Sequence, residues 1–140
     1  MKKAIYGEDK RVIDWVGPRI DEDDFGKAVT IGLEENGQLI AGVVFNLYTG
    51  PSICMHVAAE PGKRWLTKEY LFRCFAYPFL QLKCNRITGL VRVDNFEAQK
   101  FDEHLGFVRE GILRRAASDG TDLILYGMLK EECRWLEIKK

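Results

Sequence analysis

A glycine followed by two basic residues lies where a strand is expected to end and a helix to begin. These residues are Gly62, Lys63 and Arg64, between an apolar run that ends at Ala58 and another that starts at Leu66. The first turn of a helix presents unpaired N–H groups and the positive end of the helix dipole, so anions bind there. The pattern predicts a phosphate site, although it lacks the second glycine and the Lys-Ser/Thr ending of a P-loop. A basic turn without a ligand is the alternative reading.

The first half of the chain is expected to form a helix and then three antiparallel strands. A short helix is predicted over Lys10–Val16, ended by Gly17-Pro18. Two β-branched runs flank Asn36-Gly37, which suits a type I′ turn because both of its central residues need positive φ. The strands are predicted over Ala28–Leu33, Leu39–Phe45 and Ile53–Ala58. The acidic run Asp21–Asp24 is expected to lie in a solvated loop.

The second half is expected to alternate helices and strands. A largely buried helix is predicted over Leu66–Leu80, where Pro78 should kink or end it because proline has no N–H. The strand Asn85–Val93 should lie parallel to the strand before that helix, because such crossovers are right-handed. A second helix is predicted from Asp94, with Glu97 at capping-box spacing and Gly106 as its left-handed end. A hairpin over Phe107–Ala116 and Thr121–Leu129 completes a mixed α+β domain around a twisted sheet.

Composition narrows the class of protein. The chain has 140 residues, 46% hydrophobic and 30% charged, which excludes a disordered, collagen-like or coiled-coil chain and predicts one domain. Equal numbers of basic and acidic residues, 21 each, argue against a general nucleic-acid binder. No apolar run approaches the ~20 residues that span a bilayer, and the first residues do not resemble a secretory signal. The scattered cysteines are expected to be reduced and mostly buried, in a cytosolic protein: Cys54, Cys74, Cys84 and Cys133.

The most specific pattern lies between Asn95 and Met128. The segments are Asn95-Phe96-Glu97-Ala98, then H-L-G-F-V-R-E-G-I-L-R from His104, then D-L-I-L-Y-G-M from Asp122. They resemble the "N-x-x-A/S", "K-L-G-F-x-x-E-G-x-L-R" and "D-x-x-x-Y-x-M" signatures of the ribosomal-protein N-terminal acetyltransferase branch of the GNAT superfamily. The resemblance covers about residues 27–136 and, together with the length of the chain, predicts a single N-acetyltransferase domain over residues 1–140. It also implies the GNAT fold, a mostly antiparallel sheet with a central parallel pair of strands that splay apart, flanked by helices.

The resemblance further implies acetyl-coenzyme A as cosubstrate, and no metal. The cofactor would lie in the gap between the strand of Val57 and the strand of Ile87. The implied cofactor-binding residues are Val57, Ala58, Gly62, Lys63, Arg64, Trp65, Leu66, Thr67, Asn95, Ala98 and Phe101. The phosphate loop departs from the family pattern, because Pro61, Arg64 and Leu66 replace Gln or Arg, Gly and a small residue.

Acetyl transfer to an amine needs a path for the amine proton and a proton for the leaving thiolate. His56 borders the implied gap and is the candidate base, because an imidazole titrates near neutral pH. Glu60 is a second candidate, acting through a water molecule. A structural histidine and a solvated carboxylate are the corresponding alternatives. Many family members carry a tyrosine that serves the thiolate at the position of Asp102, so the usual acid is absent.

The expected function is therefore transfer of acetyl from acetyl-coenzyme A to a primary amine by direct attack in a ternary complex. The acceptor would be a protein N-terminus, a lysine or a small amine, with the branch resemblance favouring an N-terminus. The alternatives are an inactive GNAT-fold module that binds a protein partner, and a nucleic-acid binder that uses the basic second half. A phage or bacterial cytoplasm, a monomer or homodimer, and no membrane partner are expected.

Charge is unevenly distributed along the chain. Residues 1–60 carry 6 basic and 10 acidic residues, whereas residues 61–140 carry 15 and 11. The basic half begins at the implied phosphate loop, and the acidic half contains the implied acceptor side. This asymmetry favours an anionic cofactor and a cationic amine.

Overall fold

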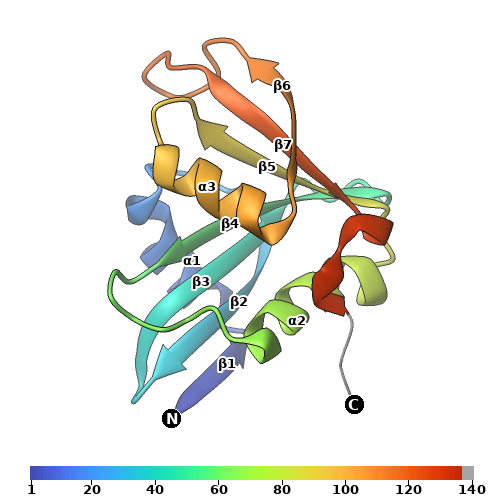
Figure 1. The fold of residues 1–140 in the computed structure, drawn as a ribbon. Helices are drawn as coiled ribbons and strands as arrows, with labels where there is room; N and C mark the ends of the chain where they lie inside the picture. Colours follow the sequence, from blue (N-terminus) through green and yellow to red (C-terminus); the bar gives the residue numbers. More distant parts are fainter. Residues whose placement is uncertain (137–140) are drawn as a thin grey trace.

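The computed structural model describes residues 1–136, which fold around one sheet covered by helices on both faces (Figure 1). The seven strands follow the order β1-β2-β3-β4-β5-β7-β6, and only β4 and β5 pair in parallel. The strands are β1 Lys2–Tyr6, β2 Ala28–Glu35, β3 Gln38–Asn46, β4 Ser52–Ala59, β5 Arg86–Arg92, β6 Val108–Leu113 and β7 Leu123–Leu129. The helices are α1 Asp9–Arg19, α2 Lys68–Ala76 and α3 Phe96–Leu105, with a π-helical turn over Tyr77–Gln81 and 3₁₀ turns over Lys130–Glu132 and Arg134–Leu136. The predicted mixed fold and parallel pair are confirmed; β1 was not predicted, because Ile5 is its only buried residue.

Helix α1 packs on one face of the sheet, through Val12 and Val16. Gly32 and Gly42 are paired across β2 and β3 beneath it. A Cβ atom at Gly42 would lie 2.7 Å from a methyl carbon of Val16, so the glycine lets the helix lie directly on the strands. The predicted end of this helix is wrong, since it continues through Gly17-Pro18 to Arg19. Proline is tolerated there because it falls in the last turn, next to residues that are packed tightly on the sheet.

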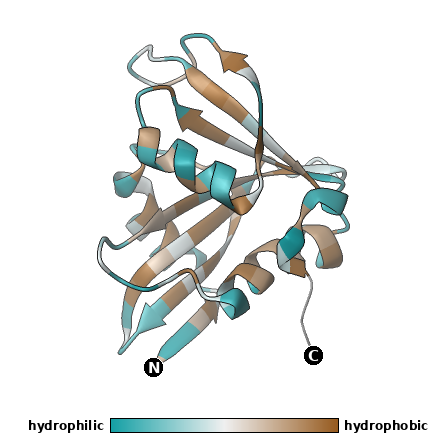
Figure 2. Cartoon of the chain, viewed as in Figure 1, coloured by the Kyte–Doolittle hydropathy of each residue, from teal (hydrophilic) through white to brown (hydrophobic). Residues whose placement is uncertain are grey.

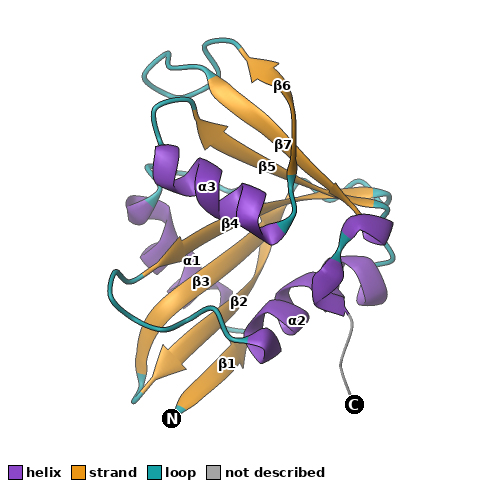
Figure 3. Cartoon of the chain, in the orientation of Figure 1, coloured by secondary structure: helices purple, strands orange, loops and turns teal. Residues whose placement is uncertain are grey.

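Helices α2 and α3 cover the opposite face, which carries the larger apolar core (Figures 2 and 3). Helix α2 begins later than predicted, because Thr67 caps it by accepting a hydrogen bond from Tyr70 N at 3.1 Å. The predicted kink at Pro78 is confirmed as the change from α-helix to π-helical turn. The buried cysteines are all unbridged, as expected.

The turns follow the sequence closely, with one correction at α3. Asn36 and Gly37 both have positive φ, as the type I′ prediction requires. Gly106 ends α3 with a φ of 111°. The cap of α3 is Asn95 rather than Asp94, because Asn95 Oδ1 accepts from Ala98 N at 3.1 Å. Asp94 instead pairs with Arg92, 3.0 Å away.

Candidate active site

The parallel strands β4 and β5 separate partway along their length. Only Ser52, Ile53 and Cys54 of β4 pair with β5, and the last of these pairs joins Cys54 to Thr88. Beyond it β4 pairs only with β3 and β5 only with β7 within residues 1–136. The facing backbone edges of Met55–Ala59 and Gly89–Arg92 therefore border an open gap. The splayed pair that the sequence implied is confirmed.

A pocket of about 380 Å³ opens at this gap. Its walls are β4, β5, α3, the loop that follows α1, and the hairpin between β6 and β7. Strand edges, rather than side chains alone, thus line part of the pocket. Unpaired strand edges can bond an extended ligand that carries amide groups, in the manner of an added strand.

His56 lies on β4 at the edge of this pocket, with its side chain on the α1 face of the sheet, where its ring lies 5.2 Å from that of Phe25 between centroids. Its Nε2 is 2.9 Å from Asn46 Oδ1. Asn46 uses its amide nitrogen to donate to the carbonyl of Phe25 at 3.0 Å, so its oxygen faces the imidazole. Nε2 must then carry the proton, which leaves Nδ1 as the free lone pair. Burial lowers the pKa of His56 to about 4, so the ring is neutral at pH 7.

Asp102 projects from α3 into the same pocket. A Cβ atom at Gly89 would lie 3.3 Å from Asp102 Oδ2, so the carboxyl group rests on the bare backbone of β5. Burial, and then the neighbouring Glu103, raise the pKa of Asp102 to about 7. The sequence analysis noted only that Asp102 stands where many family members have a tyrosine, and assigned it no role. The available signal was Gly89, because an isolated glycine inside a strand often marks a close approach.

Some of the implied cofactor-binding residues do gather at the pocket. Val57, Asn95, Ala98 and Phe101 all line it. The oxygen of Asn95 is used to cap α3, so only its NH₂ group is free to bind a ligand. Ala58 turns its side chain to the opposite face, where it packs with the α1 cluster. Only its backbone is available to the gap.

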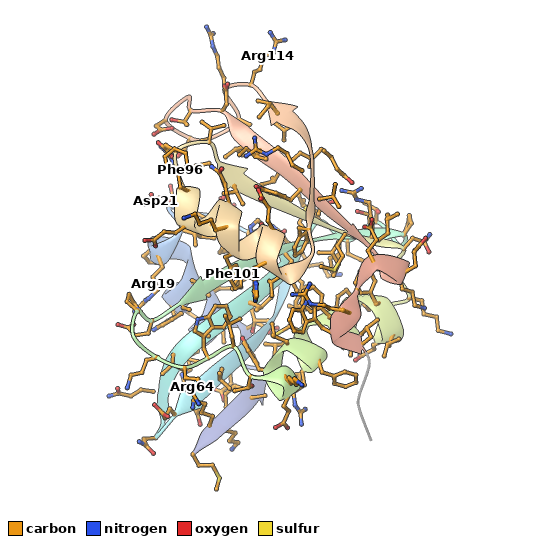
Figure 4. The ribbon with its side chains drawn as sticks, viewed as in Figure 1. Arg19, Asp21, Arg64, Phe96, Phe101 and Arg114 are labelled. Atoms are coloured by element: carbon orange, nitrogen blue, oxygen red, sulfur yellow. The ribbon has the colours of Figure 1, made fainter. Side chains whose placement is uncertain are left out.

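The implied phosphate loop does not line the pocket. Its Lys63 lies 3.6 Å from Glu35, in a separate surface depression between α1 and the β2–β3 turn. Glu60 faces that depression too, and accepts a hydrogen bond from Arg19 at 3.3 Å. Gly62 has a φ of 80°, and Arg64 is exposed, well away from α3 in Figure 4. Leu66 is also exposed, and Thr67 serves as the cap of α2.

Trp65 connects the two regions. Its ring lies 5.2 Å from that of Phe101 and 6.4 Å from that of Tyr70, between centroids. Phe101 also lines the pocket, so an aromatic contact joins α3 to the β4–α2 loop beside the pocket. This contact involves one residue of the loop implied to hold phosphate and one residue of the wall of the gap implied to hold the thioester.

The mouth of the pocket is acidic. The loop after α1 contributes Asp21, Glu22, Asp23 and Asp24 to its lining, and all four are exposed. Asp21 of this loop, labelled in Figure 4, and Asn95 at the start of α3 both line the pocket. The loop was predicted to be solvated, which is confirmed, but its place at the pocket was not foreseen. Clustered carboxylates attract cations to such a mouth.

Solved structures of acetyltransferases share the fold of this chain. A mutant form of the spermidine N-acetyltransferase SpeG from Vibrio cholerae matches 98% of this chain with 96% of its own, at a TM-score of 0.74 and 19% identity. The chain has the GNAT acetyltransferase fold. The dodecameric structure of the Vibrio cholerae enzyme matches 94% of both chains, with a TM-score of 0.70 and 18% identity. A protein described as a probable acetyltransferase matches 76% of this chain, with a TM-score of 0.65 and 21% identity.

These similarities are structural. This chain spans only 64% of the length of that probable acetyltransferase. No protein-family model and no curated protein matches the sequence. Among residues 1–136, no helix combines the length and apolar character needed to cross a membrane. The same residues hold no group of three or more His, Cys, Asp or Glu side chains arranged for a metal ion.

Proposed function

We propose that the protein transfers acetyl from acetyl-coenzyme A to a primary amine by direct attack in a ternary complex. The observation that carries this proposal is the gap between β4 and β5, which opens after Cys54 and Thr88 into the pocket beneath α3. The pantetheine arm of coenzyme A is thin and carries amides, which suit unpaired strand edges. The GNAT fold of the chain supports the same reading.

We propose an acceptor molecule that carries a primary amine and is positively charged overall. The amine that attacks is in its neutral form. The four carboxylates at the mouth of the pocket support this choice, because they raise the local concentration of cations. A polyamine is supported by the fold similarity to spermidine N-acetyltransferase. A protein N-terminus, or alternatively a lysine, is supported by the motif resemblance between Asn95 and Met128. An amine panel separates these classes.

Within this reaction His56 has a limited part. Its free Nδ1 accepts a hydrogen bond from the attacking amine, which orients the nitrogen lone pair toward the acetyl carbon. Because the pKa of His56 is lowered to about 4, the ring does not retain the proton, which passes to solvent. We assign Glu60 no proton transfer in this reaction, because it lies in the other depression, beside Arg19.

A second candidate is a GNAT-fold module that binds a protein partner and no longer binds coenzyme A. The contact between Trp65 and Phe101 favours it, since this contact holds a residue of the β4–α2 loop against the wall of the gap. The position of Lys63, paired with Glu35, favours it as well.

Thermal unfolding with and without acetyl-coenzyme A separates the two candidates. A ligand that binds only the folded state raises the melting temperature saturably. We expect this for the wild type and not for Val57→Trp, which fills the gap with a bulky ring. Val29→Trp is the matched control, because Val29 is an exposed β2 residue. An unchanged melting temperature of the wild type at millimolar acetyl-coenzyme A would reject the acetyltransferase hypothesis.

We also propose a bacterial or phage protein of the cytoplasm that acts as a monomer or homodimer. The four buried, unbridged cysteines support a reducing compartment. Size-exclusion chromatography with light scattering measures the oligomeric state directly.

A further inference from the structure

The carboxyl group of Asp102 lies at the apex of the gap. Gly89, the residue beneath it, directly follows Thr88, the last β5 residue that pairs with β4. A Cβ atom there would be 3.3 Å from Asp102 Oδ2, 3.7 Å from Tyr126 Cβ and 3.9 Å from the ring of Phe107. The carboxyl group thus lies close to the backbone of Gly89, where a Cβ atom would crowd it, among largely apolar neighbours and where the strands part.

The residues around Asp102 supply it with no cation. No hydrogen bond joins its side chain to another described residue. Glu103, next to it on α3, accepts a hydrogen bond from Tyr126 at 2.7 Å. Across the gap, the neutral His56 is engaged with Asn46.

The nearest cations are committed to other groups. On β5, Arg92 pairs with Asp94 at 3.0 Å and with Asp119 at 2.9 Å. On β6, Arg109 donates to Gln99 at 3.1 Å. At the mouth of the pocket, α1 contributes Arg19, whose guanidinium lies over Trp15, and the charged residues that line the pocket from the following loop are all carboxylates. The surroundings therefore favour the protonated form, and the pKa of Asp102 is raised to about 7.

We infer that Asp102 is the acid that protonates the leaving thiolate of coenzyme A, an inference that rests on the proposed function. It is a carboxyl group without a hydrogen-bonding partner, facing the pocket at the one place where both strand edges meet. A group that titrates near the working pH is the most effective proton donor, because it is both protonated and acidic enough. His56 and Asp102 line the pocket from opposite faces of the sheet, His56 from the α1 side and Asp102 from the α3 side. Their pKa values shift in opposite directions, which separates the roles of acceptor and donor.

The neutral amine attacks the acetyl carbon, and a C–N bond forms. The C–S bond breaks, its electron pair goes to sulfur, and the carboxyl proton of Asp102 moves to that sulfur to give the thiol. The amine nitrogen loses its extra proton to water by way of His56, and the carboxylate of Asp102 takes a proton back from water. The products are an amide and free coenzyme A.

Asp102→Asn tests the inference with little change of shape. We expect kcat at pH 7 to fall by at least about 100-fold, with the KM for acetyl-coenzyme A changed less than about threefold. In the wild type kcat should fall as pH rises above about 7, because the raised pKa leaves the acid protonated only below that value. This decrease of kcat at high pH should be absent in Asp102→Asn. Glu97→Gln, an exposed carboxylate on the same helix, is the control and should behave as wild type.

A second readout needs no cofactor. Carboxyl ¹³C NMR of the free protein should show one aspartate signal that titrates near pH 7 and is absent from Asp102→Asn. A midpoint below about 5, close to that of an ordinary aspartate, overturns the inference whatever the activity. Unchanged kcat in Asp102→Asn overturns it too, while leaving the acetyltransferase in place. A wild type that neither binds acetyl-coenzyme A nor acetylates any amine overturns the proposed function, and the inference falls with it.

Discussion

The two walls of the gap differ in which of their residues reach the pocket. The β5–α3 wall keeps an asparagine cap at Asn95, a left-handed end at Gly106 and a glycine at the apex. The β4 wall continues into a loop whose Lys63 faces a different depression and whose Trp65 packs on α3. The difference teaches that backbone geometry places the residues of the β5–α3 wall at the pocket, whereas side-chain contacts hold Lys63 and Trp65 of the β4–α2 loop outside its lining.

The largest expected effect is on the β5–α3 wall. Gly89→Ala places a methyl group 3.3 Å from Asp102 Oδ2, which must displace the carboxyl group. We expect kcat to fall by about 100-fold, as for loss of a general acid. Steady-state kinetics with acetyl-coenzyme A measures it.

Gly111→Ala is the matched control for that substitution. Gly111 lies on β6, and a Cβ atom there meets nothing within 4 Å. Equal activity of the two alanine variants would show that the apex has no special role, and the contrast between the walls would disappear.

An intermediate effect is expected on the β4 wall. Trp65→Ala removes the ring that packs against Phe101, which opens the route from the loop to the pocket. We expect acetyl-coenzyme A to bind about tenfold more tightly, or about 1.4 kcal/mol, as measured by isothermal titration calorimetry.

Trp15→Ala is the control for that change. Trp15 is equally part-buried but lies under Arg19 in the other depression. Weaker binding by Trp65→Ala would mean that the indole holds the cofactor rather than obstructing it, and both walls would then contribute to the site.

The smallest effect is expected at the mouth of the pocket. Asp23→Asn removes one of four clustered charges, so kcat/KM for a polyamine should fall about threefold at low salt and less at high salt. Glu131→Gln, an exposed charge outside the pocket lining, should leave kcat/KM unchanged. Equal values for both variants at low salt would exclude the acidic loop from acceptor recognition.

Much of the fold could be predicted, because local rules determine it. Asn36-Gly37 and Gly106 need positive φ, which fixes one hairpin and one helix end. The right-handed crossover fixed the parallel pair. The end of α1 was predicted wrongly because tertiary packing of Val16 outweighs the effect of Pro18, and packing is not visible in a local pattern.

The site could be predicted only where backbone geometry creates it. Val57, Asn95, Ala98 and Phe101 reach the pocket because the strand pair and α3 place them there. The side chains of Lys63 and Trp65 could not be placed, because their directions depend on Glu35 and Phe101, which are distant in sequence. The pKa of Asp102 is raised mainly by burial, which depends on tertiary packing, so sequence alone does not reveal it.

The most direct test of the central claim is mass spectrometry of an amine panel incubated with the protein and acetyl-coenzyme A. The panel holds polyamines, lysine and peptides with free N-termini. We expect a cationic primary amine to gain one acetyl group with the wild type and none with Val57→Trp. If every amine stays unmodified while the wild-type protein is folded, the gap between β4 and β5 is not an acetyl-transfer site.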